Sequence, residues 1–500
     1  MVLHIAVNAF TPYGFHRDEF LYMAMGQHLR LWSMDFPPFM AIVSKLVRAT
    51  IGDSLTGIRT LPALAGGALV FMTGAIAGEL GGSRRAQILS AVAVALSPLF
   101  LRSADLFQPV VFDQLWWSVA LFLVARLCAE GTSSDVLGTA PPVWAALGIA
   151  FGIGLLTKFS ILFLGMAFAI ALTISRERRT WVTPWPWITA LIALVVGSPS
   201  LVGQMRLGYP VLAQMDALQR TQLTNVSSLV YVTEQLLWGP GVVLAFLGLC
   251  YLLFGRGAVR YRLVGLTCAI AWLLLWVLHG KSYYIGPIYP TLFAAGGVAV
   301  EEWERRSHRF ARIGIGTWLV LTCAYALVTF PLTLPILPAQ TTAEFATRLG
   351  ITSATRSNHG VQLNLPQDYA DLLGWPEQAN AVSDIYRSLP IDQRARTVIM
   401  AENYGEAGAL DFYGARLGLP PVVSAAGSYW FFGAGPLPGE TVIAVGVSKA
   451  DLEHRCGTVI LAGRVQSEWA APEDSDVPLF LCGNPPQTLQ QLWPALAGRN

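Results

Sequence analysis

The chain is dominated by long apolar runs that are separated by short polar connections. Ten runs come close to the roughly 20 residues that a helix needs to cross the hydrocarbon of a bilayer. They are 58–79, 86–101, 113–129, 143–157, 159–174, 186–202, 236–254, 263–279, 285–300 and 313–333. Their apolar residues are continuous rather than alternating, which favours helices over the strands of a barrel. The pattern predicts an α-helical polytopic membrane protein with about ten or eleven transmembrane helices.

The first 57 residues interrupt this pattern. Residues 1–10 are apolar but too short to span a bilayer, so we expect a truncated helix or one that begins upstream. Residues 16–19 are His-Arg-Asp-Glu. Placing a charged side chain at the bilayer centre costs about 2.5–3.5 kcal/mol of free energy, so this segment is not expected to span the bilayer. Segment 11–57 is therefore expected to be a loop or an interfacial segment, with a short surface helix at 39–49.

The last third of the chain has a different pattern, typical of a soluble α/β domain. Short runs rich in β-branched residues predict strands at 397–400, 441–445, 458–461 and 477–481, and longer stretches predict helices at 366–374, 378–388 and 405–417. We therefore divide the chain into a membrane domain, residues 1–333 with the outer loop 11–57, and a soluble domain, residues 334–500.

Composition agrees with a membrane protein. Hydrophobic residues make up 54% of the chain and charged residues 13%, whereas soluble domains carry about 25% charge. This excludes a cytosolic globular enzyme, a disordered chain and a collagen-like chain. The tail 334–500 holds 10 Lys/Arg and 16 Asp/Glu, a net charge of −6, which leaves +8 on the rest. Neither part has the basic stripe that nucleic acid requires, so nucleic acid is not expected as a partner.

The basic residues also predict the topology. The connections alternate between two sets. One set, at the ends of the first, third, fifth, seventh and ninth runs, holds 13 Lys/Arg, and the other set holds five. Cytoplasmic connections of membrane proteins are the basic ones. The sequence therefore predicts a multi-pass protein of the cell membrane, with segment 11–57 and the tail 334–500 outside the cytoplasm.

Two of the six cysteines lie in the polar tail. If that tail faces an oxidising compartment, Cys456 and Cys482 are candidates for a disulfide; two free thiols are an equally good interpretation. The cysteine and histidine spacing matches no metal site, so no metal and no other cofactor is predicted.

Three acidic positions are candidates for chemistry. Asp18 could act as a general base tuned by its charged neighbours, or it could belong to a solvated interfacial loop. Asp35 precedes Pro37-Pro38 and could simply mark a turn. Asp113 opens an apolar run and could be a helix cap.

A fourth candidate is the segment after residue 279. Lys281 beside Tyr283 and Tyr284 could hold a phosphate, or the group could be an aromatic belt with a snorkelling lysine. Lys158, in a tight turn, is better explained by snorkelling. The centres of the ten runs contain no Asp, Glu, Lys or Arg, whereas ion-coupled transporters usually need such groups there. Chemistry at the outer surface is therefore favoured over transport.

The order of these motifs resembles that of bacterial members of the dolichyl-phosphate-mannose protein mannosyltransferase-like family. The motifs are His-Arg-Asp-Glu-x-x-Tyr at 16–22, Asp-x-Pro-Pro at 35–38, Arg-Thr-Leu-Pro-Ala-Leu at 59–64, an Asp in the second outer loop, Gly-Lys-x-Tyr-Tyr at 280–284, and 401–413 in the tail. These proteins are membrane glycosyltransferases of the GT-C fold, related to the lipid A aminoarabinose transferases. The resemblance extends through most of the chain, and it implies a polyprenyl-phosphate sugar as donor.

The resemblance also implies roles for single residues. Asp18 matches the catalytic base and Glu19 its acidic neighbour. Asp113 matches a second-loop aspartate that helps to build the site, with Asp105 as the runner-up. Lys281 matches the region near the lipid phosphate. The remaining substrate-binding candidates are His16, Arg17, Asp35, Tyr283 and Tyr284.

One departure from the related proteins limits the substrate. The aminoarabinose transferases have Glu-Lys before their Pro-Pro, whereas this chain has Asp35-Phe36. The missing cation argues against that sugar and against a lipid A acceptor. The resemblance leaves the acceptor open as a protein, a lipid or a glycan, and it implies a reaction that often needs no metal.

These observations predict an integral membrane glycosyltransferase that acts on the extracytoplasmic side, among membrane lipids. The alternative is a flippase or other transporter of a polyprenyl-phosphate sugar, which only the number of helices favours. A third possibility is an inactive membrane scaffold that carries a binding or assembly domain.

Overall fold

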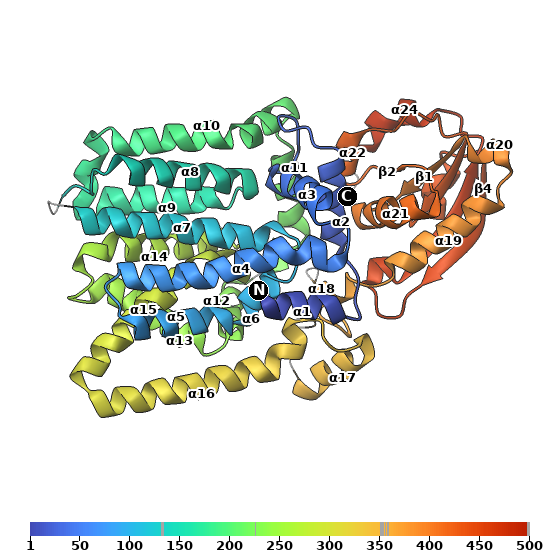
Figure 1. Cartoon of the computed structure of the whole chain (residues 1–500). Helices are drawn as coiled ribbons and strands as arrows, with labels where there is room; N and C mark the ends of the chain where they lie inside the picture. The colour runs from blue at the N-terminus through green and yellow to red at the C-terminus, as the bar shows by residue number, and fades with distance from the viewer. Residues whose placement is uncertain (132–134, 226, 351–354, 356, 358–359, 498–500) are drawn as a thin grey trace.

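The apolar runs form one bundle of helices, and the tail forms a small sheet with its own helices at one end of that bundle (Figure 1). The computed structural model describes the whole chain except residues 132–134, 226, 351–354, 356, 358–359 and 498–500. The main bundle helices are α4 (Leu55–Glu79), α5 (Arg84–Ala95), α7 (Pro109–Glu130), α8 (Pro141–Thr157), α9 (Ile161–Ile174), α10 (Trp185–Arg206), α13 (Gly241–Phe254), α14 (Arg262–Val277), α15 (Tyr289–Arg306) and α16 (His308–Thr333). Each of the ten predicted runs falls largely on one of these helices, which confirms the predicted helical membrane fold.

The helices differ in how well each could cross a bilayer alone. Among the described residues, five helices are long and apolar enough to cross a bilayer: α4, α7, α10, α14 with its preceding turn, and α16. A sixth crossing would combine α13 with the preceding α12 (Ser228–Glu234), which meets it at a bend of 109°. The helices α8 and α9 are apolar but shorter.

The run predicted at 86–101 is interrupted in the structure. Pro98 starts the separate short helix α6 (Pro98–Ser103), because a proline is favoured in the first turn of a helix and cannot continue the preceding one. The bundle therefore bends there, next to the second outer loop.

Small residues allow close packing of α8 against α10. A Cβ added at Gly152 would lie 2.5 Å from Cβ of Val196, and one added at Gly197 would lie 2.8 Å from Cβ of Leu155. Such contacts let two helix backbones approach each other, which is a common way to associate helices in lipid.

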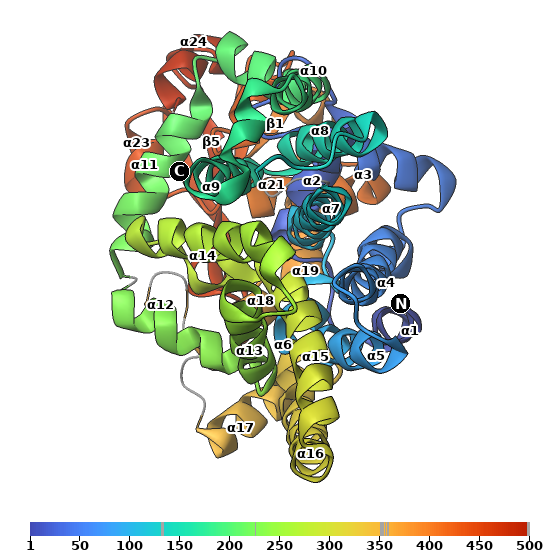
Figure 2. The same ribbon diagram turned by 90° about the vertical axis from the view of Figure 1, so that its left-hand side faces the viewer.

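The two sets of connections that differ in charge lie at opposite ends of the bundle (Figure 1). At the basic end, Glu304 lies 3.6 Å from Arg85 and 3.3 Å from Arg312, and the Tyr261 hydroxyl donates to the Glu79 carbonyl. The other end meets the soluble domain. Figure 2 looks along the helices from the basic end and shows α16 at the edge of the bundle, beside α15.

The tail contains a five-stranded mixed sheet in the order β2-β1-β3-β5-β4. The strands are β1 (Thr397–Ala401), β2 (Val422–Ser424), β3 (Thr441–Val445), β4 (Thr458–Gln466) and β5 (Asp476–Gly483). Strands β2, β1 and β3 are parallel, and β5 is antiparallel to both β3 and β4. The α/β prediction is confirmed, although the short strand β2 was not predicted. The structure joins Cys456 and Cys482 in a disulfide.

The outer loop 11–57 contains two helices between the bundle and the soluble domain. The surface helix predicted at 39–49 is α3 (Phe39–Thr50), whereas α2 (Arg17–Gln27) was expected to be irregular. Helix α2 packs against α21 (Tyr404–Leu417) of the soluble domain so closely that a Cβ added at Gly408 would lie 2.6 Å from Cβ of Phe20. Phe20 also contacts Trp375 and Phe412, so a hydrophobic cluster joins the two parts.

Candidate active site

The start of α2 determines how the acidic pair is presented. His16 is the N-cap, and its Nδ1 accepts a hydrogen bond from the Asp18 backbone N–H at 3.1 Å. The Glu19 carboxylate reaches back to the His16 backbone N–H at 2.7 Å, which completes a capping box. In a helix, consecutive residues point about 100° apart. Asp18 and Glu19 therefore face different surroundings.

Glu19 faces the interior of the protein and has no exposed area. Its two carboxylate oxygens accept from Nε and Nη2 of Arg59 at 2.8 and 2.7 Å, and one also accepts from the Phe107 backbone N–H. Burial by itself would raise the pKa of Glu19, but the charge and hydrogen bonds of Arg59 lower it below its ordinary value. Glu19 thus joins α2 to α4 and to the second outer loop, and its expected catalytic role stays a prediction.

Asp18 is the accessible member of the pair, with 32% of its side chain exposed. Its Oδ1 accepts from the Tyr404 hydroxyl at 2.9 Å and its Oδ2 accepts from Nε2 of Gln108 at 3.1 Å. Each carboxylate oxygen offers two lone pairs. The carboxylate is therefore held from two sides and still has acceptor capacity toward solvent.

His16 and Arg17 point to the soluble domain rather than to open space. His16 Nε2 lies 3.5 Å from Oδ2 of Asp371. Burial by itself lowers the pKa of His16, but the carboxylates of Asp371 and Asp18 outweigh it and raise the pKa above its ordinary value. Arg17 donates to Glu473 at 2.7 Å and lies over the ring of Tyr404. Both side chains are engaged in contacts within the protein, and their expected contact with substrate stays a prediction.

The runner-up Asp105 is buried in a second polar network. It lies 4.0 Å from Arg59 and 3.5 Å from Arg102, and it accepts from Asn8 at 3.2 Å. Burial raises the pKa of Asp105, and the two arginines oppose that change. Arg102 also donates to Asp368 at 3.2 Å, and thereby ties the second outer loop to the soluble domain.

The preferred second-loop candidate, Asp113, lies one turn into α7 and does not contact Asp18. Its carboxylate accepts from Trp117 Nε1 at 3.1 Å and from the Ser160 hydroxyl at 2.7 Å, and the residue is buried. The second-loop residue that contacts Asp18 is Gln108 instead. Asp113 therefore faces the start of α9, whose N-cap is Ser160.

Asp35 is also turned inward. Its carboxylate accepts from the Ser428 hydroxyl at 2.8 Å, and burial raises its pKa to about 6. The side chain connects the loop between α2 and α3 to the soluble domain, and its expected contact with substrate stays a prediction.

The Lys281 region is brought to the same end of the bundle as Asp18. Lys281 Nζ donates to Gln222 Oε1 at 2.5 Å and lies 5.9 Å from the centre of the Tyr283 ring. Burial lowers the pKa of Lys281 to about 8, and the charges of Asp368 and Asp18 act against that lowering. Lys158 Nζ lies over the ring of Tyr284 at 5.0 Å. Lys281 therefore lies close enough to Asp18 and Lys158 for their charges to affect its pKa.

Two groups of side chains that share Asp371 have the composition of a metal site, and the second consists of Asp371, Glu473 and Asp474. In the first, His16, Asp368 and Asp371 each place a ligand atom within 4.8 Å of the others. Arginines already contact both carboxylates, however: Arg102 Nε lies 3.2 Å from Asp368 and Arg17 Nη1 lies 3.9 Å from Asp371. Both guanidinium groups are shared with further carboxylates, since Arg17 Nη1 also lies 2.7 Å from Glu473 and Arg102 Nη1 lies 3.5 Å from Asp105.

Sequence reasoning missed four residues of this site: Gln108, Asp368, Asp371 and Tyr404. Tyr404 follows β1 and opens α21, at the carboxyl end of a strand where ligand-binding residues of α/β domains gather. Tyr404 could therefore have been identified as a candidate from its position, because the preceding strand was predicted at 397–400. Nothing in the spacing indicates that Asp18 and Tyr404, 386 residues apart, share a hydrogen bond.

Comparison with known proteins adds two findings. Residues 35–202 match the family model described as dolichyl-phosphate-mannose-protein mannosyltransferase. No curated protein sequence matches the chain.

Solved structures extend the likeness to almost the whole chain. The fold is similar to that of ArnT from Cupriavidus metallidurans bound to undecaprenyl phosphate, with 15% identity, 96% of each chain covered and a TM-score of 0.62. It is also similar to archaeal oligosaccharyltransferase AglB from Archaeoglobus fulgidus in complex with an inhibitory peptide and a dolichol-phosphate. That match has 11% identity, covers 89% of this chain and 69% of the other, and has a TM-score of 0.51.

The matched segment 35–202 contains three of the ordered motif positions, Asp35, Arg59 and Asp113, and begins after Asp18. The helical bundle with a soluble domain at one end is the architecture shared with the solved structures. The predicted resemblance and the predicted fold are therefore confirmed: residues 35–202 of this multi-pass membrane protein match the model of the dolichyl-phosphate-mannose-protein mannosyltransferase family, and the chain has the GT-C fold of the similar membrane glycosyltransferase structures.

Proposed function

We propose that the protein is a membrane glycosyltransferase that moves a sugar from a polyprenyl-phosphate carrier to an acceptor hydroxyl, with Asp18 as the general base. The observation that carries the proposal is the Asp18 carboxylate itself. It is partly exposed, oriented by Tyr404 and Gln108, and located at the end of the bundle that also presents Lys281.

The reaction would use these groups as follows. Asp18 accepts the proton of the acceptor hydroxyl as that oxygen bonds to the anomeric carbon of the sugar. The bond from the anomeric carbon to the phosphate oxygen breaks, and its electron pair leaves with the phosphate. Lys281 offsets the negative charge that develops there. Arg17 is occupied by Glu473 and Asp371, so it supports the site instead of taking the phosphate.

The carrier class is supported by the similar structures. ArnT was solved with undecaprenyl phosphate and AglB with a dolichol-phosphate. A lipid carrier requires a site at the membrane surface, and Lys281 lies directly after the bundle helix α14. The proposal includes no metal cofactor, because Arg17 and Arg102 already contact Asp371 and Asp368, two members of the candidate metal groups.

We further propose that the reaction takes place outside the cytoplasm. The basic connections lie at the opposite end of the bundle from Asp18, and the positive-inside rule assigns that end to the cytoplasm. The disulfide between Cys456 and Cys482 supports the same orientation, since disulfides persist in oxidising compartments.

The test is complementation of a gene deletion, read as cell-envelope glycans by mass spectrometry. The wild type should restore the glycoform that the deletion removes, and Asp18→Asn should not, although it is made and inserted normally. Removal of a general base typically costs about 10²–10⁴-fold in rate. Asp384→Asn, an exposed carboxylate on α19 (Trp375–Ser388), is the matched control and should restore the glycoform. Full restoration by Asp18→Asn would refute the assigned base.

A further inference from the structure

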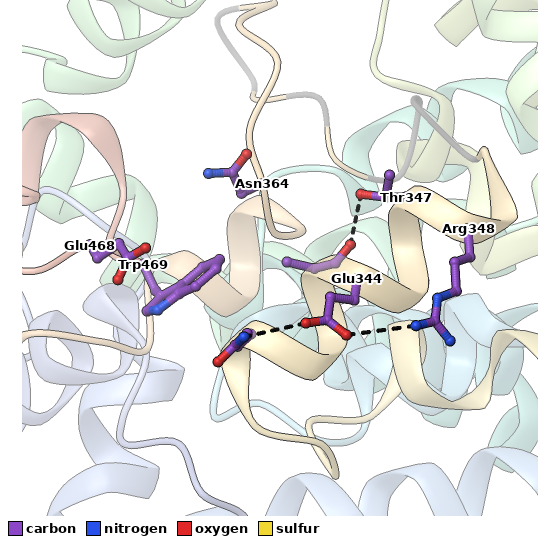
Figure 3. A pocket seen from close by; sticks show the side chains of 8 residues that line it. Glu344, Thr347, Arg348, Asn364, Glu468 and Trp469 are labelled. Carbon is purple, nitrogen blue, oxygen red and sulfur yellow. Dashed lines mark hydrogen bonds and ion pairs between the residues drawn. The ribbon is translucent and has the colours of Figure 1, made fainter.

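A cavity of about 630 Å³ lies outside the site described above. It is formed between α17 (Ala339–Leu349), the helix that follows the bundle, and two segments of the soluble domain. Its lining includes Gln340, Glu344, Arg348, Asn364, Glu468 and Trp469. Figure 3 shows the Trp469 indole extending toward the side chains of α17, with Asn364 above this space.

One wall is the polar face of α17. Gln340, Glu344 and Arg348 are spaced four residues apart and so lie on one side of the helix. Gln340 donates to Glu344 at 3.3 Å, and Arg348 lies 3.9 Å from the same carboxylate. Glu344 remains 53% exposed and Arg348 81% exposed. This wall therefore offers amide, carboxylate and guanidinium groups side by side, with acceptors and donors still available to a ligand.

The opposite wall is aromatic. The indole of Trp469 is half-buried, and it packs against the cluster that contains Tyr13, Tyr369 and Leu372. The rest of the side chain lines the cavity beside Glu468 and Asn364. Ligand sites combine an apolar surface with a few polar groups that fix orientation, and an indole offers a broad, rigid apolar face.

A flat apolar face surrounded by many small donors and acceptors suits one class of ligand in particular. A sugar ring has a C–H face that packs on an aromatic ring, and its rim of hydroxyl groups needs both donors and acceptors. A lipid tail would leave the Glu and Arg groups without partners, and a phosphate would be repelled by Glu344 and Glu468.

We propose that this cavity binds a saccharide, namely the glycan part of the acceptor. The assignment to the acceptor rests on the proposed function. The cavity adjoins the Tyr13–Tyr369 layer, and the chain continues from Tyr13 to Asp18 within five residues. Asp368, next to Tyr369, has a carboxylate oxygen within 4.8 Å of a ring nitrogen of His16, and His16 lies 4.0 Å from Asp18. An acceptor held here would extend toward Asp18, whereas the donor is anchored in the membrane by its lipid.

Binding is tested with the full-length protein in lipid nanodiscs and an array of defined oligosaccharides with neutral, amino and acidic sugars. Hits are titrated by saturation-transfer difference NMR. Trp469→Ala should weaken binding at least tenfold, and Trp469→Phe should weaken it less because it keeps an aromatic face. Glu344→Ala should weaken binding without touching the aromatic cluster. Thr341→Ala, exposed on α17 but outside the cavity lining, should bind like the wild type.

Saccharide binding in the cavity and transfer at Asp18 can be tested separately. Asp18→Asn should bind the oligosaccharide normally, so loss of transfer and loss of saccharide binding report on different sites. Among variants active in transfer, Trp469→Ala should raise the KM for acceptor and leave the KM for donor unchanged. A rise in the donor KM instead would contradict the assignment to the acceptor. Absence of binding across the array, or equal binding by the wild type, Trp469→Ala and Glu344→Ala, would overturn the proposal.

Discussion

Asp18 is held by two neutral donors, the Tyr404 hydroxyl and the Gln108 amide. A guanidinium paired directly with this carboxylate would stabilise its charged form and reduce its tendency to accept a proton. Arg17, the adjacent cation in the chain, is instead directed to Glu473 and Asp371. Neutral donors orient the carboxylate without neutralising it, which is what a general base requires.

Tyr404 is therefore expected to act as a positioning residue from the soluble domain. In Tyr404→Phe the carboxylate loses one of its two side-chain supports, and small misplacements of reacting groups can cost up to about 100-fold in rate. We expect kcat to fall roughly 10- to 100-fold while the KM for the donor stays unchanged.

The matched control removes a similar hydrogen bond elsewhere in the same domain. Tyr429 donates to Asp411 at 2.8 Å, so Tyr429→Phe should lower stability slightly and leave kcat unchanged. A Tyr404→Phe variant with normal kcat would show that Asp18 does not depend on this contact.

Lys281 gives the proposed phosphate contact a pH dependence. Burial lowers the pKa of Lys281 to about 8, so the ammonium is charged below that pH and loses its charge as the pH rises through it. Binding of farnesyl phosphate, followed by calorimetry from pH 6.5 to 9.5, should weaken across this range in the wild type. Lys281→Arg should stay level because arginine remains charged.

The alanine variant distinguishes binding from folding. Loss of a charge-assisted hydrogen bond costs about 1.5–3 kcal/mol, so Lys281→Ala should bind farnesyl phosphate at least tenfold more weakly at pH 7. If its affinity is normal and its thermal midpoint falls sharply, the lysine has a structural role.

At the scale of elements, α2 is the piece on which the site is built. Its N-terminus is fixed by the His16–Glu19 capping box, its buried face by Arg59 of α4, and its apolar face by α21. Each contact comes from a different part of the chain, so the direction in which Asp18 points is determined jointly by the bundle and by the soluble domain.

The Glu19–Arg59 pair should make stability sensitive to acid. Because the pKa of Glu19 is lower in the folded protein than its ordinary value of 4.5, the pair contributes fully above pH 4.5 and is lost as pH falls through the folded-state value. The thermal midpoint in detergent should therefore fall below pH 4.5. Glu19→Gln leaves buried Arg59 with Asp105, 4.0 Å away, as its remaining carboxylate neighbour, and should cost up to about 3–5 kcal/mol at neutral pH.

The control for this experiment is a surface pair. Arg48 and Asp53 form an ion pair with partly exposed side chains, so Asp53→Asn should change stability by about 0–1 kcal/mol. If Glu19→Gln is no less stable than Asp53→Asn and keeps the wild-type response to acid, the buried pair is not the source of that response.

At the scale of the whole molecule, the bundle separates two chemically different ends. One end carries the basic connections, and the other carries Asp18, Lys281 and the soluble domain (Figure 1). A polyprenyl-phosphate sugar would meet the protein where the bundle ends and the polar site begins. This arrangement supports the proposal that catalysis takes place at the membrane surface and not along a path through the bundle.

The orientation is tested by labelling with a membrane-impermeant maleimide. Ser388→Cys, exposed at the end of α19 in the soluble domain, should react in intact spheroplasts. Arg178→Cys, exposed in a basic connection, should react only after the membrane is permeabilised. The reverse pattern would place the proposed chemistry in the cytoplasm. Cys323, which is exposed in the structure, should be replaced by Ala in both variants.

Several features could be predicted from the chain alone because they depend on local pattern. Continuous apolar runs require helices in lipid, and the alternation of basic and neutral connections groups them at two ends. The strands at 441–445 and 477–481 were visible as short β-branched runs. The ordered motifs led to the correct fold and to Asp18 and Lys281 as candidates at one end of the bundle.

Other features depend on how distant segments pack, and only the tertiary structure decided them. The sequence presents Asp18 and Glu19 as equivalent neighbours. A helical turn of about 100° separates them into an accessible carboxylate and a buried partner of Arg59. Asp113 is turned away from Asp18 by the same geometry, and Tyr404 reaches Asp18 from 386 residues away. Local pattern thus determined the elements and their ends, whereas long-range packing selected which side chains form the site.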